Sequence, residues 1–279
     1  MDSKRAIEFF LEDVLWRPVQ RGVTDVGRAS TAILEAVADF SYLCLGLFRR
    51  ITQRWDKRDV AMFFEQVFEV GYRSLPVAIT AAVFTGMALA LQLAFGLARF
   101  GAKTYVGTIV AFALVRELAP VLTSLLVGGR VGSGFTAEIG SMAVTEQIDA
   151  MRALGSDPLR RLIMPRVLAC MLVFPLLTTL ADILGVAGGM VVSYLESGVG
   201  PRFFMESVLR SLKVKDVASG IIKTIFFGFF VGVIACNEGI RTHGGTVGLG
   251  QAVKKTVVSA LVAILVSNFL LSKVLMLLW

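Results

Sequence analysis

The sequence predicts an all-α polytopic membrane protein, and three observations support this fold class. Of the 279 residues, 56% are hydrophobic and only 18% are charged, and the mean hydropathy is +0.74, whereas soluble domains are richer in charge. Five apolar stretches reach or approach the ~20 residues that cross the hydrocarbon core of a bilayer. Because lipid supplies no hydrogen-bond partners to the backbone, these stretches are expected to be helices.

The expected elements follow in order along the chain. Residues 1–73 form an amphipathic, interfacial region, and residues 74–279 form a five-span domain. Residues 30–48 have one apolar helix face, but Glu35 and Asp39 interrupt the stretch. Two carboxylates near the bilayer centre would be costly, so we favour a surface helix there over a sixth span. The expected spans are 75–97 (with Pro76 in its opening turn), 105–129, 167–195, 217–235 and 253–278.

The distribution of basic residues predicts the orientation of these spans. With a cytoplasmic N-terminus, the inner segments 1–73, 130–166 and 240–255 contain 19 Lys and Arg residues, and the outer segments contain 7. The positive-inside rule therefore places the N-terminus in the cytoplasm and, after five spans, the C-terminus on the outer side. Basic residues beside membrane spans also account for the net charge of +7, so no nucleic-acid partner is expected.

The soluble segment 130–166 lies between two apolar blocks and contains a short predicted helix at residues 145–154. Thr145 can cap its start, and Gly155 and Pro158 can end it. A helix of two to three turns is marginal in water, so we expect it to dock onto another protein. The alternative is a solvated loop helix without a partner. The residues expected to make the contact are Glu146, Gln147, Ile148, Asp149, Met151 and Arg152.

Among the ionisable residues inside the predicted spans we single out four, namely Arg116, Glu117, Asp182 and Lys223. Such residues are costly in lipid and usually face a cavity or a partner. Arg116 and Glu117 are sequence neighbours about 100° apart on a helix, so each needs another partner. Counting from the span ends places these two near mid-membrane and the other two in the outer half. We expect a polar cavity open to the outer side, and the alternative is a set of ion pairs that only holds the bundle together.

Several kinds of active site have no counterpart in the sequence. No Gly-Lys dipeptide occurs, so the chain has no Walker-type phosphate loop, and any ATP must be bound by a separate chain. His243 is the only histidine, which argues against a histidine-based metal site and against a membrane-embedded lipid enzyme. A secondary transporter usually carries an inverted repeat, which five spans and one central loop do not supply. These two functions remain the alternatives to the one below.

Ordered motifs extend from about Phe64 to the C-terminus. They are RELAPVL at 116–122, GRVG at 129–132, AEIGSM at 137–142, VTEQIDA at 144–150, DP at 157–158, PRVLA at 165–169, IKT at 222–224 and a glycine-rich stretch at 237–250. In these motifs the chain resembles the MlaE permease family, the membrane subunits of MCE-type ABC lipid transporters. Ala119 departs from the glycine that many relatives have, and the first sixty residues match only loosely.

The resemblance implies a homodimer of five-span subunits in the inner membrane, with a periplasmic C-terminus. It implies two ABC ATPase subunits on the cytoplasmic side, a coupling helix around Glu146, an MCE protein assembly on the periplasmic side, and phospholipid as cargo. For such a cargo, Arg116 and Lys223 are the cations expected to bind phosphate. We expect Glu117 to pair with one of them when the cavity is empty. When lipid enters, we expect its phosphate to replace the carboxylate as the partner of that cation.

Overall fold

The computed structural model describes Gly46 and residues 56–278. The chain divides into two units, Met1–Gly46 and Leu47–Trp279, and every element below belongs to the second. Except for Gly46, the surface helix predicted at 30–48 lies outside the described residues. In this part of the chain all regular structure is helical, which confirms the all-α fold class.

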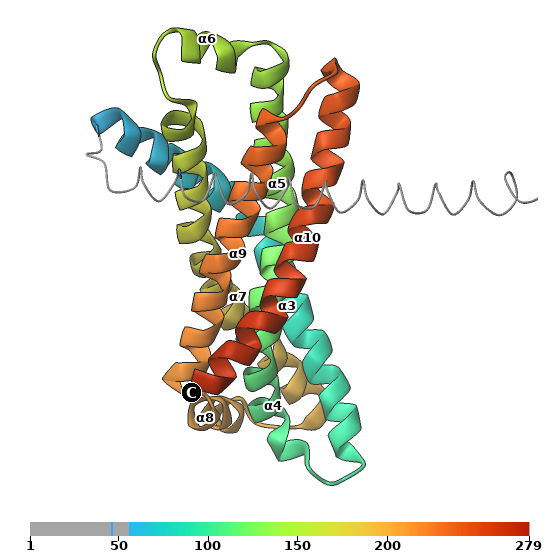
Figure 1. Cartoon of the computed structure of the whole chain (residues 1–279). Helices are drawn as coiled ribbons and strands as arrows, with labels where there is room; N and C mark the ends of the chain where they lie inside the picture. The colour runs from blue at the N-terminus through green and yellow to red at the C-terminus, as the bar shows by residue number, and fades with distance from the viewer. Residues whose placement is uncertain (1–45, 47–55, 279) are drawn as a thin grey trace, which may run out of the picture. The chain divides into compact units, whose positions relative to one another are not determined.

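The elements follow one another through a bundle of long helices (Figure 1). They are α3 (Lys57–Ala98), the 3₁₀ turn η2 (Lys103–Tyr105), α4 (Val106–Ala113), the π-helical turn η3 (Leu114–Leu118), α5 (Ala119–Val144), α6 (Gln147–Ala153), the π-helical turn η4 (Leu159–Ile163), α7 (Met164–Ser197), α8 (Pro201–Ser211), α9 (Val214–Ile240) and α10 (Gly245–Leu278). Within the described residues, five helical stretches are long and apolar enough to cross a membrane: Lys57–Ala98, Lys103–Val144, Leu159–Ser197, Val214–Ile240 and Gly245–Leu278. These stretches contain the five predicted spans, whereas the choice between a surface helix and a sixth span at 30–48 falls on residues outside the described part of the chain.

Two helices extend further than the sequence pattern indicated. Helix α5 continues to Val144, so the first part of segment 130–166 is helical rather than loop. Helix α3 begins at Lys57, where Asp56 and Asp59 form a reciprocal capping box, and Pro76 therefore lies inside this helix instead of in its opening turn. Hydropathy marks where apolar residues stop, whereas backbone hydrogen bonding sets where a helix ends.

Both π-helical turns have the same sequence cause. Each is five residues long and is followed by one residue and then a proline, Pro120 after η3 and Pro165 after η4. Proline has no N–H and crowds the carbonyl four residues earlier, so the regular hydrogen-bond ladder cannot continue there. The wider π turn accommodates this break and leaves a carbonyl for another donor.

The two ends of the bundle collect different segments (Figure 1). Helix α6 lies at one end with the turn between α9 and α10, while α4, α8 and the end of α10 lie at the other. Residues 56–59 belong to the α6 end, because Asp59 pairs with Arg160 of η4. The charge pattern predicted the same grouping, with the α6 end in the cytoplasm. That orientation remains a prediction.

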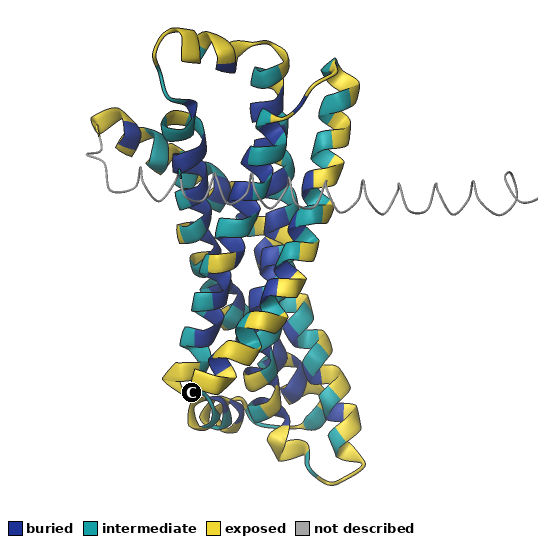
Figure 2. Ribbon diagram, in the orientation of Figure 1, coloured by how far each residue is buried: buried dark blue, intermediate teal, exposed yellow. Residues whose placement is uncertain are grey.

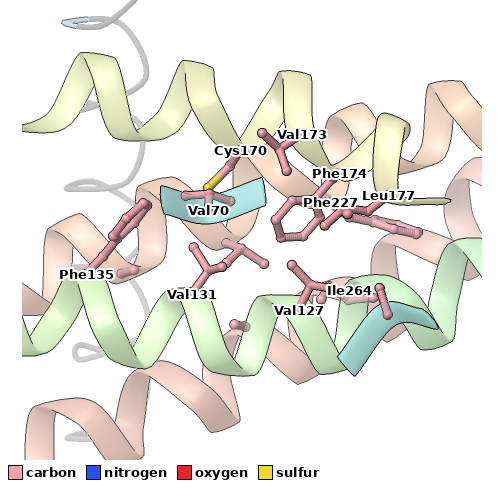
Figure 3. Close-up of a cluster of buried hydrophobic side chains, with 14 residues drawn as sticks. Val70, Val127, Val131, Phe135, Cys170, Val173, Phe174, Leu177, Phe227 and Ile264 are labelled. Carbon is pink, nitrogen blue, oxygen red and sulfur yellow. The ribbon is translucent and has the colours of Figure 1, made fainter. Parts of the chain in front are cut away.

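The interior of the bundle is apolar and tightly packed (Figures 2 and 3). Its largest cluster joins all five candidate spans, for example through Val70 of α3, Phe174 of α7, Phe227 of α9 and Ile264 of α10. Glycines allow the closest approaches. A Cβ on Gly86 of α3 would lie 1.9 Å from the carbonyl oxygen of Gly185 on α7, so the lack of a side chain at these positions lets the two helices approach closely.

Candidate functional site

One carboxylate connects three elements near the α8 end of the bundle. Oε1 of Glu117, on η3, lies 2.7 Å from Nζ of Lys223, on α9. From α10, Oγ of Ser272 donates to Oε1 at 3.0 Å and Nδ2 of Asn268 donates to Oε2 at 3.2 Å. The lysine side chain is fully buried, whereas that of Glu117 is 38% exposed. Glu117 therefore lies between the buried lysine and the accessible surface of the chain.

The π turn explains how the buried lysine is satisfied. Pro120 cannot donate to the carbonyl of Arg116, the residue four positions earlier. Nζ of Lys223 donates to this carbonyl oxygen at 3.0 Å. The lysine thus receives one charged and one neutral acceptor, which lowers the cost of burying an ammonium group. Pro120 is therefore the residue in the sequence that leaves the carbonyl of Arg116 open to a donor from another helix.

The Arg116 side chain takes a different direction from that of its neighbour. Its Nη1 atom lies 3.8 Å from Oδ1 of Asp216, in the first turn of α9. Its guanidinium also lies over the ring of Phe112, 5.2 Å from the ring centre. Arg116 lines a pocket of about 260 Å³ together with Lys213, Lys215, Asp216, Ser219, Leu275 and Met276.

The four charged residues are only partly brought together. The contact between Glu117 and Lys223 puts their charged groups at a similar level of the bundle, near its α8 end, whereas counting from span ends placed Glu117 nearer mid-membrane than Lys223. The expectation relied on counting from span ends that the helices overrun. Asp182 of α7 has no hydrogen bond to any of the other three, and its Oδ1 atom is buried without a hydrogen-bond partner among the described residues. Asn268 and Ser272, which the sequence reasoning missed, carry no charge that would have marked them.

Helix α6 is shorter than predicted and begins differently. Thr145 is not its N-cap: its hydroxyl donates to the carbonyl of Ser141 at 2.8 Å and closes α5. Glu146 precedes α6 with φ 59°, a left-handed conformation that reverses the chain after α5 without a glycine. At the other end, Gly155 has φ 72°, and its N–H donates to the carbonyl of Arg152. The prediction that Gly155 ends the helix is confirmed.

The predicted contact residues of α6 are mostly exposed (Figure 2). Glu146, Gln147, Asp149 and Arg152 are exposed, Met151 is half-buried, and only Ile148 is buried, at 3%. Asp149 and Arg152 pair with each other at 2.9 Å. Leu154, just after the helix, is 85% exposed. A short helix anchored through one side chain therefore presents polar groups and a large apolar side chain at the end of the bundle.

A pocket of about 330 Å³ lies beside this helix. Its other wall is the turn between α9 and α10, from Ile240 to Gly245, and this wall includes His243. The sequence reasoning did not single out this turn as part of a contact surface. Its glycines, Gly244 and Gly245, have φ values of 86° and 68°, so they permit a tight reversal that brings the turn near α6.

Ion pairs link neighbouring helices at the α6 end of the bundle. Nη2 of Arg166 on α7 lies 2.9 Å from Glu138 on α5, and Lys255 on α10 lies 2.9 Å from Glu238 on α9. Within the described residues, no three His, Cys, Asp or Glu side chains gather closely enough to hold a metal ion. These ion pairs join the two helices that flank α6 and the two that flank the turn between α9 and α10.

Known proteins match most of this chain. The sequence model described as Permease MlaE matches residues 63–274. A probable ABC transporter permease protein of Synechocystis sp. is 43% identical over 208 residues, covering 75% of this chain and 79% of the relative. A probable ABC transporter permease protein of Rickettsia conorii is 36% identical over 248 residues, covering 89% and 95%.

A plant protein extends this range of relatives. The chloroplastic protein TRIGALACTOSYLDIACYLGLYCEROL 1 of Arabidopsis thaliana is 39% identical over 208 residues, covering 75% of this chain and 59% of the relative. The family match includes η3, α6 and the turn between α9 and α10, so it covers both regions described above. The chain therefore belongs to the MlaE permease family, and it is a multi-pass transport subunit rather than an enzyme.

Proposed function

We propose that this chain is the membrane subunit of an ABC transporter that moves phospholipids between the inner membrane and a conduit of MCE proteins. The observation that carries the proposal is one continuous helix. Helix α5, 26 residues long, joins the π turn that bears Arg116 and Glu117 to the exposed helix α6. At 1.5 Å per residue it spans about 39 Å, so a displacement of α6 can be transmitted to the charged cluster.

Helix α6 is proposed to be the contact for a separate ATPase. Its exposed residues Glu146, Gln147, Asp149 and Arg152 offer charges of both signs, and Leu154 offers an apolar side chain. Charges of both signs beside one apolar side chain are groups through which a partner of complementary charge can be recognised. Two permease chains and two ATPase chains would form the complex, and ATP would be bound only by the ATPase.

The charged cluster is proposed to receive the lipid phosphate. Arg116 and Lys223 are the cations. In the arrangement described above, Glu117 is the ion-pair partner of Lys223. A phosphate that displaced the carboxylate would preserve the charge balance around the buried lysine, so the exchange would not strand a buried charge. The role of Asp182 stays a prediction, since no contact joins it to the cluster.

Purification from the native membrane tests the proposal. A tagged chain, extracted with mild detergent, should bring with it an ATPase, an MCE-domain protein and phospholipid, identified by mass spectrometry of proteins and lipids. Reconstituted complex should hydrolyse ATP in a lipid-dependent manner. Transport of lipid by the chain alone, without an ATPase, would favour a secondary transporter instead, and chemical conversion of the lipid would favour an enzyme.

A further inference from the structure

We infer that the pocket between η3, the start of α9 and the end of α10 is a first binding site for the phosphate of a phospholipid headgroup. The pocket holds about 260 Å³ and is lined by Arg116, Lys213, Lys215, Asp216, Ser219, Leu275 and Met276. The inference rests on the proposed phospholipid cargo. It adds two residues, Lys213 and Lys215, that lie outside the membrane-embedded charges and that no motif marked.

The charge of the pocket favours an anion. Three cationic side chains and one carboxylate line it. Asp216 is already engaged, because its Oδ2 accepts the backbone N–H of Lys213 at 3.0 Å and its Oδ1 faces Arg116 at 3.8 Å. The two lysines are exposed, so their ammonium groups remain free to turn toward a phosphate.

Arg116 gives the pocket a fixed element. Its side chain is 23% exposed, and stacking on Phe112 limits the orientations of the guanidinium plane. A planar guanidinium held in this way donates two parallel hydrogen bonds to phosphate oxygens with little further loss of side-chain freedom. The pocket therefore combines one oriented donor group with two mobile charges.

Lys223 does not provide this first contact. It is fully buried, and Glu117 and the carbonyl of Arg116 already accept from its Nζ atom. A phosphate reaches this lysine only after Glu117 has moved. Arg116 takes part in both the pocket and the environment of Lys223. Its side chain lines the pocket, and its backbone carbonyl accepts a hydrogen bond from Lys223. The pocket is therefore the outer step of a path whose inner step is the exchange at Lys223.

The opposite wall indicates a lipid rather than free phosphate. Leu275 is buried and Met276 is 64% exposed, and exposed apolar side chains precede them along α10 at Phe269, Leu270 and Val274. An inorganic phosphate gains nothing from such a wall, whereas the glycerol and acyl carbons of a phospholipid gain by leaving water. The combination of cations and apolar side chains fits a phosphate attached to acyl chains.

The test compares lipid binding in matched variants of the full chain, purified in detergent. The double variant Lys213→Gln with Lys215→Gln removes two charges and leaves the backbone hydrogen bond of residue 213 to Asp216 in place. Arg99→Gln with Lys103→Gln is the control, since both residues are exposed at the same end of the bundle and outside the pocket. Native mass spectrometry titrates each protein with dioleoylphosphatidylglycerol, dioleoylglycerol and inorganic phosphate, and the melting temperature reports folding.

The lysine variant should bind dioleoylphosphatidylglycerol about thirtyfold more weakly than wild type, since it removes two lysines and each lysine near a lipid headgroup contributes on the order of 1 kcal/mol. The control variant and dioleoylglycerol binding should stay unchanged, and Lys213→Arg with Lys215→Arg should restore the affinity. Equal phosphatidylglycerol affinity in the Gln variant and the wild type would contradict the proposed pocket and leave the proposed phospholipid cargo standing. Inorganic phosphate that binds as tightly as the lipid would overturn the lipid assignment. Wild-type protein that binds no phospholipid would overturn the proposed cargo, and this site with it.

Discussion

Glu117 and Lys223, with 2.7 Å between Oε1 and Nζ, form an ion pair that also reaches a third helix. The same carboxylate accepts hydrogen bonds from Asn268 and Ser272 of α10. Helix α10 is the least buried of the five candidate spans, and these two hydrogen bonds form part of its attachment to the bundle. Movement of Glu117 would therefore release Lys223 and loosen α10 together.

Removing only the lysine should destabilise the protein. Lys223→Met leaves the carboxylate of Glu117 without its cation, and breaking a buried pair costs about 3 kcal/mol at the lower end of the usual range. The lower end applies because Glu117 is partly exposed. Thermal unfolding in detergent should show the loss. Glu117→Gln combined with Lys223→Gln should recover most of it, since neither remaining group is charged.

The same variants separate a structural role from a headgroup role. If Lys223 binds phosphate, the doubly neutral protein should fold normally but carry less co-purified phospholipid and transport less lipid. Lipid mass spectrometry and a reconstituted transport assay measure both quantities. Full transport by the doubly neutral protein would show that the ion pair only holds the bundle together.

The contact between α3 and α7 should be sensitive to a single methyl group. A Cβ at residue 86 would lie 1.9 Å from the carbonyl oxygen of Gly185, and backbone cannot yield as a flexible side chain does. Gly86→Ala should therefore destabilise the protein by about 1–3 kcal/mol or more. Gly96→Ala is the control in the same helix, because a Cβ there meets nothing within 4 Å. Equal melting temperatures for the two variants would contradict the close approach.

The sequence predicted the fold better than it predicted the contacts. Long apolar stretches indicated five helices because the bilayer imposes both their length and their hydrogen bonding. The overruns of α3 and α5 could not be seen, since the helix continues into polar residues beyond the apolar stretch. The π turn at Leu114–Leu118 needed recognition that Pro120 breaks the ladder inside an otherwise uniform span.

The candidate site was predictable only where a charge marked it. Arg116, Glu117 and Lys223 were noticeable because ionisable groups are rare in lipid, but the spacing along the chain did not show that Glu117 and Lys223 touch. Asn268 and Ser272 are common in membrane helices and gave no signal. Lys213 and Lys215 resembled ordinary flanking charges, and only the fold brings them beside Arg116.

Cysteine labelling tests the predicted orientation. Phe100 and Leu278 lie at the α8 end with exposures of 83% and 70%, and Leu154 lies at the α6 end with 85%. In a chain whose native cysteines are replaced by alanine, an impermeant reagent should label Phe100→Cys and Leu278→Cys in intact spheroplasts. Leu154→Cys should react only after the membrane is opened. The reverse pattern would place α6 outside and contradict its role as a cytoplasmic contact.

The contact at α6 can be tested at Glu146, whose exposed carboxylate lies at the positive end of the helix and lines the pocket shared with the α9–α10 turn. Glu146→Lys places a positive charge at this helix end and repels any cation that the carboxylate attracts in a partner. We expect insertion in the membrane to survive, while association with the ATPase and lipid-dependent ATP hydrolysis fall at least fivefold. Glu206→Lys in α8 is the control, with the same charge change on an exposed residue at the opposite end.

Glu146→Gly separates the contact from the turn, because glycine adopts a φ of 59° without strain. This variant should keep the melting temperature of the wild type or raise it, yet still bind the ATPase more weakly. Unchanged ATPase binding in both Glu146 variants would make α6 a loop helix without a partner.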